Sequence, residues 1–378
     1  MSFVYGLLVM KTQLPPYQIL KDFYHDITKA MSMPMPTAEE GSLRDLFPKE
    51  GSLGDLFPQI VRFDSIHGFP AVDVARLISA TLSRSLDLRQ NLKDKTILPK
   101  EIISISMIER SPLRSEIITK VYGITNKAIL SKTDTRKASC LRIYIQGHGG
   151  NPFDFDYHNQ LRELFLKKGC DFLSMSMLGL GLNSGSANFP INRPYWQNIT
   201  LDPDKAEGHG NYAFYSDEKL PGYDPLSLFL TPHFYAIQSI VRGYEKVSLM
   251  GISGGGWYTV WLAALMPEID TSISYAGGYP LQYHYQVPNS DWEERYSNVY
   301  RFVDYWELYT LSQIDEHGES TRKLTLVFND KDSCCYSDPY ASHFKGIADS
   351  ILSLQANVII DQSNSHSMNV PLVEALLE

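Results

Sequence analysis

A serine set among glycines is the clearest chemical feature of this 378-residue sequence. The apolar run KVSLM at 246–250 is followed by Gly-Ile-Ser-Gly-Gly at 251–255, which is the pattern G-x-S-x-G. Apolar residues then recur at helical spacing, at Trp257, Val260, Trp261, Ala264 and Leu265. Glycines let a strand turn sharply into a helix, so this stretch predicts that Ser253 stands at the tip of the turn. The alternative is a glycine-rich turn that cradles a phosphate, but neither a dinucleotide fingerprint nor a P-loop lysine accompanies it.

A histidine and an aspartate follow later apolar runs and can activate such a serine. A serine hydroxyl is a weak nucleophile until a base takes its proton, and His366 follows the last apolar run in a short polar loop. The base in turn needs a carboxylate that fixes its tautomer. Asp330 and Asp332 both follow the preceding run. We prefer Asp332, because it lies farther out in the loop, and expect Asp330 to cap the turn.

The motif GHGG at 147–150 supplies backbone groups that can stabilise negative charge. It follows an apolar run, and glycine lets N–H groups approach a developing oxyanion closely. We predict that Gly150 and Gly254 donate these hydrogen bonds and that Gly149 shapes the turn. For His148 we expect a supporting role, in which its side chain hydrogen-bonds and braces the loop.

Six short apolar runs position these residues. They are LRIYIQ, CDFLSMSM, KVSLM, TSISYA, KLTLVFN and ANVIID, which begin at residues 141, 170, 246, 271, 323 and 356. Helical stretches separate them, which predicts an α/β fold with a mostly parallel sheet and helices on both faces. Chemistry in such sheets lies beyond the carboxyl ends of the strands, where each motif above falls. Two earlier stretches, EIISISMIER from 101 and EIITKVYGITN from 116, predict a leading antiparallel pair.

The chain from about 98 to 378 resembles the α/β-hydrolase superfamily. The resemblance covers the HGG loop, LGLGLNSG at 178–185, the serine turn, Asp332 and His366. Within the superfamily, the stretches GISGGGW, DWEERY, ELYTL and DKDSCCY are similar to a branch of bacterial esterase-like hydrolases. The resemblance implies the α/β-hydrolase fold, with Ser253, Asp332 and His366 as a catalytic triad. It does not indicate the substrate.

These motifs predict a serine esterase that cleaves carboxylic esters through an acyl-enzyme. We expect a small acyl group on a sugar or another alcohol, and no metal or organic cofactor. An O-acyltransferase that passes the acyl group to a saccharide would use the same triad. A peptidase and a non-catalytic binding protein on a hydrolase scaffold are weaker alternatives.

Two long insertions interrupt the predicted catalytic domain, at about 186–232 and 281–310, and both follow carboxyl ends of strands. Both are rich in aromatic residues: Phe189, Tyr195, Trp196, Tyr212, Phe214, Tyr215, Tyr223, Tyr283, Tyr285, Trp292, Tyr296, Tyr300, Phe302, Tyr305 and Trp306. We expect them to lie over the serine. Their aromatic rings either contact the substrate or pack against each other as a lid.

Residues 1–97 are predicted to form a mainly helical N-terminal appendage. The segment at 71–92 has apolar residues at helical spacing and predicts one amphipathic helix, and a near repeat at 41–60 predicts two short helical turns. The apolar stretch at 2–10 is too short to span a bilayer and lacks the flanks of a signal peptide. We therefore expect no membrane span, leave peripheral association and oligomeric state open, and slightly favour a cytoplasmic location.

Charge and cysteine content exclude further classes of function. The net charge is −9 and no basic cluster is present, which argues against a nucleic-acid partner. The four cysteines, Cys140, Cys170, Cys334 and Cys335, are too few for a disulfide scaffold and lack zinc-site spacing. The adjacent Cys334 and Cys335 permit a vicinal disulfide, but we expect two partly buried thiols.

Overall fold

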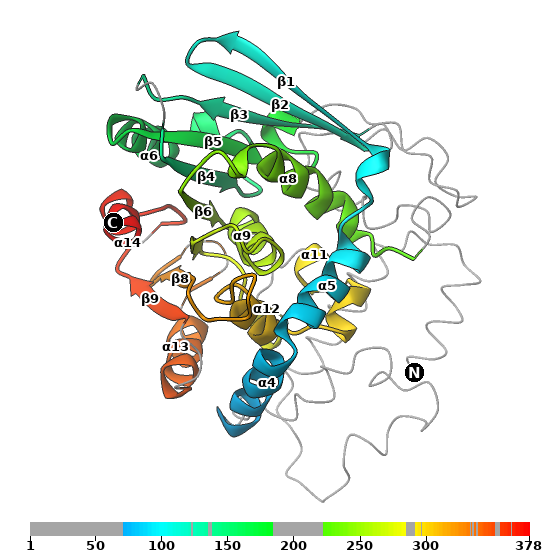
Figure 1. Ribbon diagram of the computed structural model, residues 1–378. Helices are drawn as coiled ribbons and strands as arrows, with labels where there is room; N and C mark the ends of the chain where they lie inside the picture. The colour runs from blue at the N-terminus through cyan, green and yellow to red at the C-terminus, as the bar shows by residue number, and fades with distance from the viewer. Residues whose placement is uncertain are drawn as a thin grey trace, which may run out of the picture.

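The computed structural model describes residues 71–121, 124–134, 138–183, 222–284, 292–295, 297–332, 334, 336–337, 339–351, 356–363 and 365–378. Across these residues a nine-stranded sheet has the order β1-β2-β3-β5-β4-β6-β7-β8-β9 (Figure 1). The strands are β1 Ile103–Ser111, β2 Arg114–Val121, β3 Ile124–Ser131, β4 Cys140–Gln146, β5 Cys170–Ser176, β6 Lys246–Ile252, β7 Thr271–Tyr275, β8 Lys323–Asn329 and β9 Asn357–Asp361.

The six apolar runs of the sequence form β4 to β9, and each adjacent pair among these strands is parallel. Residues of β4, β5, β6 and β8 are buried on both faces, apart from the first residue of β4, β6 and β8. Strands of this kind must be covered on both faces, which explains why their sequences are continuously apolar. The prediction of a mostly parallel sheet is confirmed.

Three antiparallel strands, rather than the predicted pair, precede the parallel set. β1 pairs with β2, β2 pairs with β3, and β3 joins the rest of the sheet along β5. The stretch EIITKVYGITN, expected as one strand, contains the end of β2 and the beginning of β3. The same alternation of apolar and polar residues continues on both sides of the reversal, so periodicity does not reveal it.

Helices cover the sheet in two groups (Figure 1). On one side α6 and α14 contact each other; on the other α4, α5, α8, α9 and α12 pack together. The helix bounds are α4 Ala71–Ser83, α5 Ser85–Thr96, α6 Asp156–Lys167, α8 Leu226–Val241, α9 Gly254–Leu265, α10 Leu281–His284, α11 Trp292–Arg295, α12 Tyr305–Leu311, α13 Tyr340–Ser350 and α14 Val370–Leu377. Short 3-10 turns are η3 Lys100–Ile102, η4 Pro152–Asp154, η5 Gly181–Asn183 and η7 Asn298–Arg301.

The helices α4 and α5 replace the single amphipathic helix predicted over 71–92. The helical conformation is interrupted at Arg84, which has φ −130 and ψ 19. The buried face continues in phase through the break, and polar Thr81 and Ser85 occupy it there. Leu82 and Leu86, which are apolar residues at helical spacing, are therefore 39% and 46% exposed.

The guanidinium of Arg89 fixes α5 to the ends of α9 and α12. It donates to the carbonyl oxygens of Ala264 at 2.9 Å, Leu311 at 3.0 Å and Asp315 at 2.8 Å, and also to that of Ile314. Carbonyls at the end of a helix lack intrahelical partners, so a buried guanidinium satisfies several of them at once. The described residues on the N-terminal side of the predicted domain boundary thus pack into the same hydrophobic core as the sheet.

Disulfide bonds depart from the expectations drawn from sequence. Cys140 and Cys170 begin the paired strands β4 and β5 and form a disulfide with a Cα–Cα distance of 4.7 Å. The strand register, which the sequence does not reveal, brings them together. Cys334 is also disulfide-bonded and is exposed, so the expectation of a partly buried thiol is wrong there. Disulfides are rare in the cytosol, which runs against the favoured location.

In the described parts of the chain, no helix has the length and apolarity needed to cross a bilayer. Several expectations concern residues outside those parts: the apolar stretch at 2–10, the near repeat at 41–60, Cys335, and the first insertion from 186 to 221.

Candidate active site

Ser253 occupies the turn between β6 and α9 with φ 57 and ψ −129. A positive φ costs a non-glycine residue about 1–3 kcal/mol, so neighbouring contacts must impose it. The Ser253 N–H donates to the Tyr275 carbonyl over 2.9 Å, and its own carbonyl accepts from the N–H groups of Gly256 and Trp257 at 2.8 and 3.1 Å. This strained strand-to-helix turn is typical of a nucleophile elbow, which exposes a hydroxyl at the carboxyl edge of a sheet.

Close packing behind Ser253 explains two of the neighbouring glycines. A Cβ atom on Gly251 would overlap the carbonyl oxygen of Gly255. One on Gly255 would overlap the carbonyl oxygen of Ile145 in β4. α9 can therefore begin this close to the sheet only with glycine at both positions.

The loop at 147–150 lies against the serine turn. A Cβ atom on Gly147 would stand 2.7 Å from Cβ of Ser253 and 3.1 Å from the backbone nitrogen of Gly254. Gly150 has φ 103, and its N–H donates to the Gly147 carbonyl over 3.3 Å. This hydrogen bond within the turn uses the Gly150 N–H, which the sequence pattern predicts as an oxyanion donor. Gly147 is the loop residue that these contacts bring beside Ser253 and Gly254.

The remaining residues of this loop make separate contacts. A Cβ atom on Gly149 would stand 2.7 Å from the ring of Phe155, so a larger residue does not fit. Nε2 of His148 lies 3.4 Å from Oε1 of Glu293, in the second insertion. Cε1 of His148 lies 2.8 Å from the point where a Cβ of Gly254 would stand. His148 therefore contacts both the insertion and the first residue of α9.

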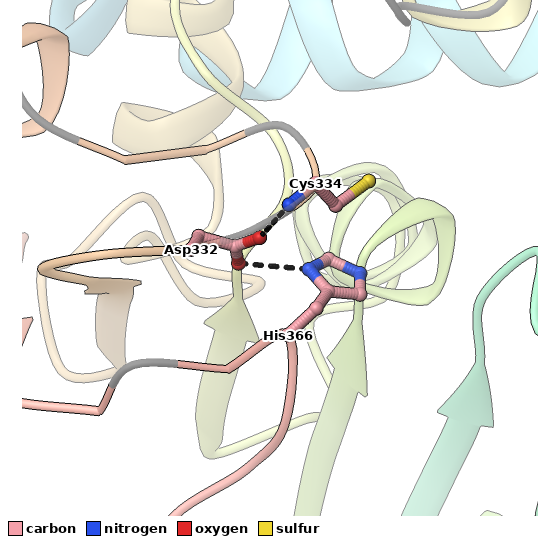
Figure 2. A group of neighbouring side chains, drawn as sticks. All are labelled: Asp332, Cys334 and His366. Carbon is pink, nitrogen blue, oxygen red and sulfur yellow. Dashed lines mark hydrogen bonds and ion pairs between the residues drawn. The ribbon is translucent and has the colours of Figure 1, made fainter.

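Asp332 and His366 form a hydrogen-bonded pair at the ends of β8 and β9. Nδ1 of His366 lies 2.8 Å from Oδ2 of Asp332, and the N–H of Cys334 donates to Oδ1 over 2.7 Å. Figure 2 shows the carboxylate between these two partners, with the second ring nitrogen of His366 pointing away from it. Asp330 instead donates its backbone N–H to the Asp361 carbonyl at 2.7 Å. Of the two aspartates considered from sequence, Asp332 is the one that contacts the histidine.

Opposing effects act on the Asp332 carboxyl. Its side chain is fully buried, and burial alone would raise its pKa. The hydrogen bond and charge of His366, the Cys334 N–H and the Asn329 amide act in the other direction and hold the pKa below its usual range. The carboxylate form is therefore the stable one at neutral pH. The His366 side chain is 25% exposed, so solvent or substrate can reach its ring.

Asn329, the last residue of β8, was not identified from sequence but ties the acid and histidine loops together. Its buried amide nitrogen lies 2.8 Å from the carbonyl oxygen of Ser365 and 3.2 Å from that of Ser367. The same nitrogen lies 3.4 Å from Oδ2 of Asp332. These contacts flank His366 on both sides. The sequence offers no signal for the contacts with Ser365 and Ser367, because they join residues more than thirty positions apart.

Asp332, Cys334 and His366 also have the spacing of a metal site, since one ligand atom from each lies within 4.8 Å of the others. A thiolate is the form of cysteine that binds metals, and Cys334 is disulfide-bonded. Nδ1 of His366 already pairs with Asp332. The donor set therefore suits a histidine–carboxylate pair better than a metal.

The described aromatic residues of the second insertion are largely buried. Tyr300 accepts hydrogen bonds from the indole N–H groups of Trp257 at 2.9 Å and Trp261 at 3.2 Å, both on α9. Its hydroxyl donates to the Glu293 carbonyl over 2.8 Å, and that of Tyr305 donates to the Glu294 carbonyl over 2.7 Å.

Among the other aromatic residues of this insertion, Tyr283 and Trp306 are buried and Phe302 is exposed. Of the two uses expected for its aromatic residues, the described rings support mutual packing. Their hydroxyls attach the insertion to the helix that begins after Ser253.

The three residues predicted to form a triad lie at the carboxyl edge of one sheet. Ser253 follows β6, Asp332 follows β8 and His366 follows β9, on a sheet whose later strands are parallel. Contacts join Ser253 to the loop at 147–150, and a separate hydrogen bond joins Asp332 to His366. This strand order, with a strained serine turn at the centre, is that of the α/β-hydrolase fold.

No protein-family model matches the chain, and no curated protein sequence matches it. Acetyl xylan esterase 1 from Thermoanaerobacterium sp. JW/SL YS485 is a similar solved structure, with 16% identity, a TM-score of 0.46, and coverage of 79% of this chain and 92% of that one. Est1E from Butyrivibrio proteoclasticus has 15% identity and a TM-score of 0.41 over 69% of this chain and 95% of its own. An acetyl xylan esterase from Paenibacillus sp. R4 has 14% identity and a TM-score of 0.42 over 79% and 92%. These scores are too low to bear on activity, and the fold assignment rests on the strand order and the serine turn.

Proposed function

We propose that the protein is a serine hydrolase that cleaves carboxylic esters with small acyl groups. The observation that carries the proposal is the left-handed backbone of Ser253 at a strand-to-helix turn. Strain of this kind clusters at active sites, and a strand-to-helix turn of this geometry presents the serine hydroxyl beside the first amide of the helix. The Asp332–His366 hydrogen bond supports the same reading, because it supplies an oriented base at the same edge of the sheet.

The proposed reaction has two stages, formation of an acyl-enzyme and its hydrolysis. Oγ of Ser253 attacks the ester carbonyl carbon while Nε2 of His366 takes the hydroxyl proton, and the carbonyl electron pair moves onto oxygen. The C–O bond to the alcohol then breaks, and the alcohol leaves with the proton from His366. A water molecule, deprotonated by His366, then attacks the acyl-enzyme. The bond between the acyl carbon and Oγ breaks, His366 returns the proton to Oγ of Ser253, and the carboxylic acid leaves. Asp332 keeps the Nδ1 proton of His366 in place throughout.

Two backbone amides are the proposed donors to the oxyanion. The first donor is the N–H of Gly254, which is the first residue of α9 and directly follows the proposed nucleophile. For the second donor we assign the N–H of His148 in place of Gly150, because Gly147 lies against Ser253 and Gly254 whereas the Gly150 N–H bonds within the turn. Removing one such donor typically costs about 100- to 1,000-fold in kcat.

Labelling with a fluorophosphonate probe tests the nucleophile directly. Wild type and Ser350→Ala, which changes an exposed serine on α13, should form one adduct that mass spectrometry locates on Ser253, and Ser253→Ala should form none. A folded wild type that stays unlabelled would contradict the proposal and favour a binding protein on this fold. Product analysis of an ester substrate with added saccharide then separates hydrolysis from acyl transfer to the sugar.

A further inference from the structure

A second histidine–carboxylate pair lies beside the serine turn. Glu293 has a fully buried side chain, and its Oε1 stands 3.4 Å from Nε2 of His148. A carboxyl group is almost never fully buried without polar partners, and the His148 ring is one partner of Glu293. The His148 side chain keeps 20% of its surface exposed. One edge of the ring therefore faces Glu293 in the interior while the remainder borders open space.

The position of Glu293 is fixed from the helix that begins after Ser253. Trp257 and Trp261 on α9 donate to the hydroxyl of Tyr300, and that hydroxyl donates to the Glu293 carbonyl. The contacts then return to α9, because Cε1 of His148 lies 2.8 Å from where a Cβ of Gly254 would stand. α9 therefore contacts His148 in two ways: through Tyr300 and Glu293, and through its own first residue, Gly254.

The strand order decides which part of a substrate His148 would meet. β4, whose loop carries His148, lies on one side of β6, while β7, β8 and β9 lie on the other. His366, which follows β9, must stand near the leaving alcohol in order to protonate it. An ester bound with its alcohol toward His366 would direct its acyl group toward the β4 side of Ser253. The partly exposed His148 ring lies on that side, and the sulfur of Met177 stands 2.5 Å from the Cβ position of Gly254.

We propose that His148, oriented by the buried Glu293 carboxylate, contacts the acyl group and limits its length. The inference rests on the proposed ester hydrolysis and adds a specificity-determining residue and a positioning residue to it. His148 acts through its ring, whereas its backbone N–H serves the oxyanion, so substitutions of the side chain leave that N–H in the chain.

Two ester substrates with acyl chains of different length test whether His148 limits acyl length. The ratio of kcat/KM for p-nitrophenyl octanoate to that for p-nitrophenyl acetate is measured for wild type, His148→Ala, Glu293→Gln and both together. We expect His148→Ala to raise the ratio about tenfold, because the removed ring leaves room for further methylenes. Glu293→Gln should raise it less, and adding it to His148→Ala should leave the ratio unchanged, because the proposed role of Glu293 in acyl length is to orient the His148 ring. His317→Ala, at a histidine 76% exposed on the surface, should behave as wild type.

The outcomes separate this inference from the proposed function. A merely structural His148 would lower kcat/KM for all chain lengths alike, and a ratio within twofold of wild type in an active protein overturns the inference alone. Equal, additive shifts from the two single variants overturn the role of Glu293. If His148→Ala does not fold, His148→Asn removes part of the ring and should give a smaller shift in the same direction. A wild type that neither cleaves these esters nor binds a fluorophosphonate overturns the function and this inference with it.

Discussion

Nδ1 of His366 stands 2.8 Å from Oδ2 of Asp332, although the two residues are 34 positions apart in the chain. Parallel β8 and β9 place them together, because both residues follow the carboxyl end of their strand. A carboxylate accepts hydrogen bonds only, so the contact favours the tautomer with the proton on Nδ1, which is the one that the proposed role of His366 as a base requires.

Asp332→Asn should lower kcat about 10,000-fold while the protein stays folded, since an asparagine supports the wrong histidine tautomer. Steady-state kinetics on an ester that wild type cleaves, with circular dichroism as the folding check, measure this. The matched control is Asp330→Asn, two residues earlier, whose kcat should stay within a few-fold of wild type. Equal losses in both variants would show that the acid has been misassigned.

The depressed pKa of Asp332 also predicts how stability depends on pH. A carboxyl whose pKa is lower in the folded state stabilises the fold above the unfolded pKa, near 3.9, and loses this contribution as pH falls through the folded pKa. The difference in free energy of unfolding between wild type and Asp332→Asn should therefore shrink as pH falls below about pH 4. Urea unfolding at a series of pH values measures it. A difference that grows as pH falls below about pH 4 would mean that the folded-state pKa of Asp332 is raised instead.

Asn329→Ala should lower kcat about tenfold with KM within twofold, because two loop carbonyls flanking His366 lose a donor and the base loses its alignment. The control is Asn357→Ala, at the exposed start of β9. Unchanged kcat in a folded Asn329→Ala protein would show that the hydrogen bond to Asp332 is sufficient to orient His366.

Arg89→Met should lower the free energy of unfolding by about 3 kcal/mol, since the Ala264 carbonyl of α9 loses its Arg89 donor and the Leu311 carbonyl of α12 retains its hydrogen bond from Arg322 at 3.3 Å. Arg242→Met changes an exposed arginine after α8 and should alter stability by less than about 0.5 kcal/mol. Denaturant unfolding of wild type and both variants measures these differences in the free energy of unfolding. A loss below 1 kcal/mol for Arg89→Met would mean that water replaces the guanidinium at these carbonyls.

The Cys140–Cys170 disulfide should contribute about 3–4 kcal/mol, as expected for a bond that closes a loop of 30 residues. Reductant should lower the denaturation midpoint of wild type, whereas Cys140→Ala/Cys170→Ala should show no dependence on reductant from this bond. Alkylation of the unreduced, unfolded protein followed by mass spectrometry gives an independent check. Modification of both cysteines without reductant would contradict the bond.

The sequence by itself determined the parallel half of the sheet and the serine turn. Buried parallel strands must be apolar along their whole length, and a sharp strand-to-helix turn needs glycine where a Cβ would overlap backbone, as at Gly251 and Gly255. Both requirements are local, so they leave a pattern in consecutive residues. The split of β2 and β3 and the break at Arg84 left no such pattern, because hydrophobic periodicity continues through both.

Only the tertiary structure decided which partners the polar groups have. The amide of Asn329, the pairing of Glu293 with His148 and the link of Arg89 to two helix ends each join segments far apart in the chain. The hydrogen bond of His366 with Asp332, the hydrogen bond from the Gly150 N–H to the Gly147 carbonyl and the Cys140–Cys170 bond depend likewise on strand register and loop direction. Residue type limits what a polar group can bind, but the packing of the strands and helices selects the partner that lies within hydrogen-bonding distance.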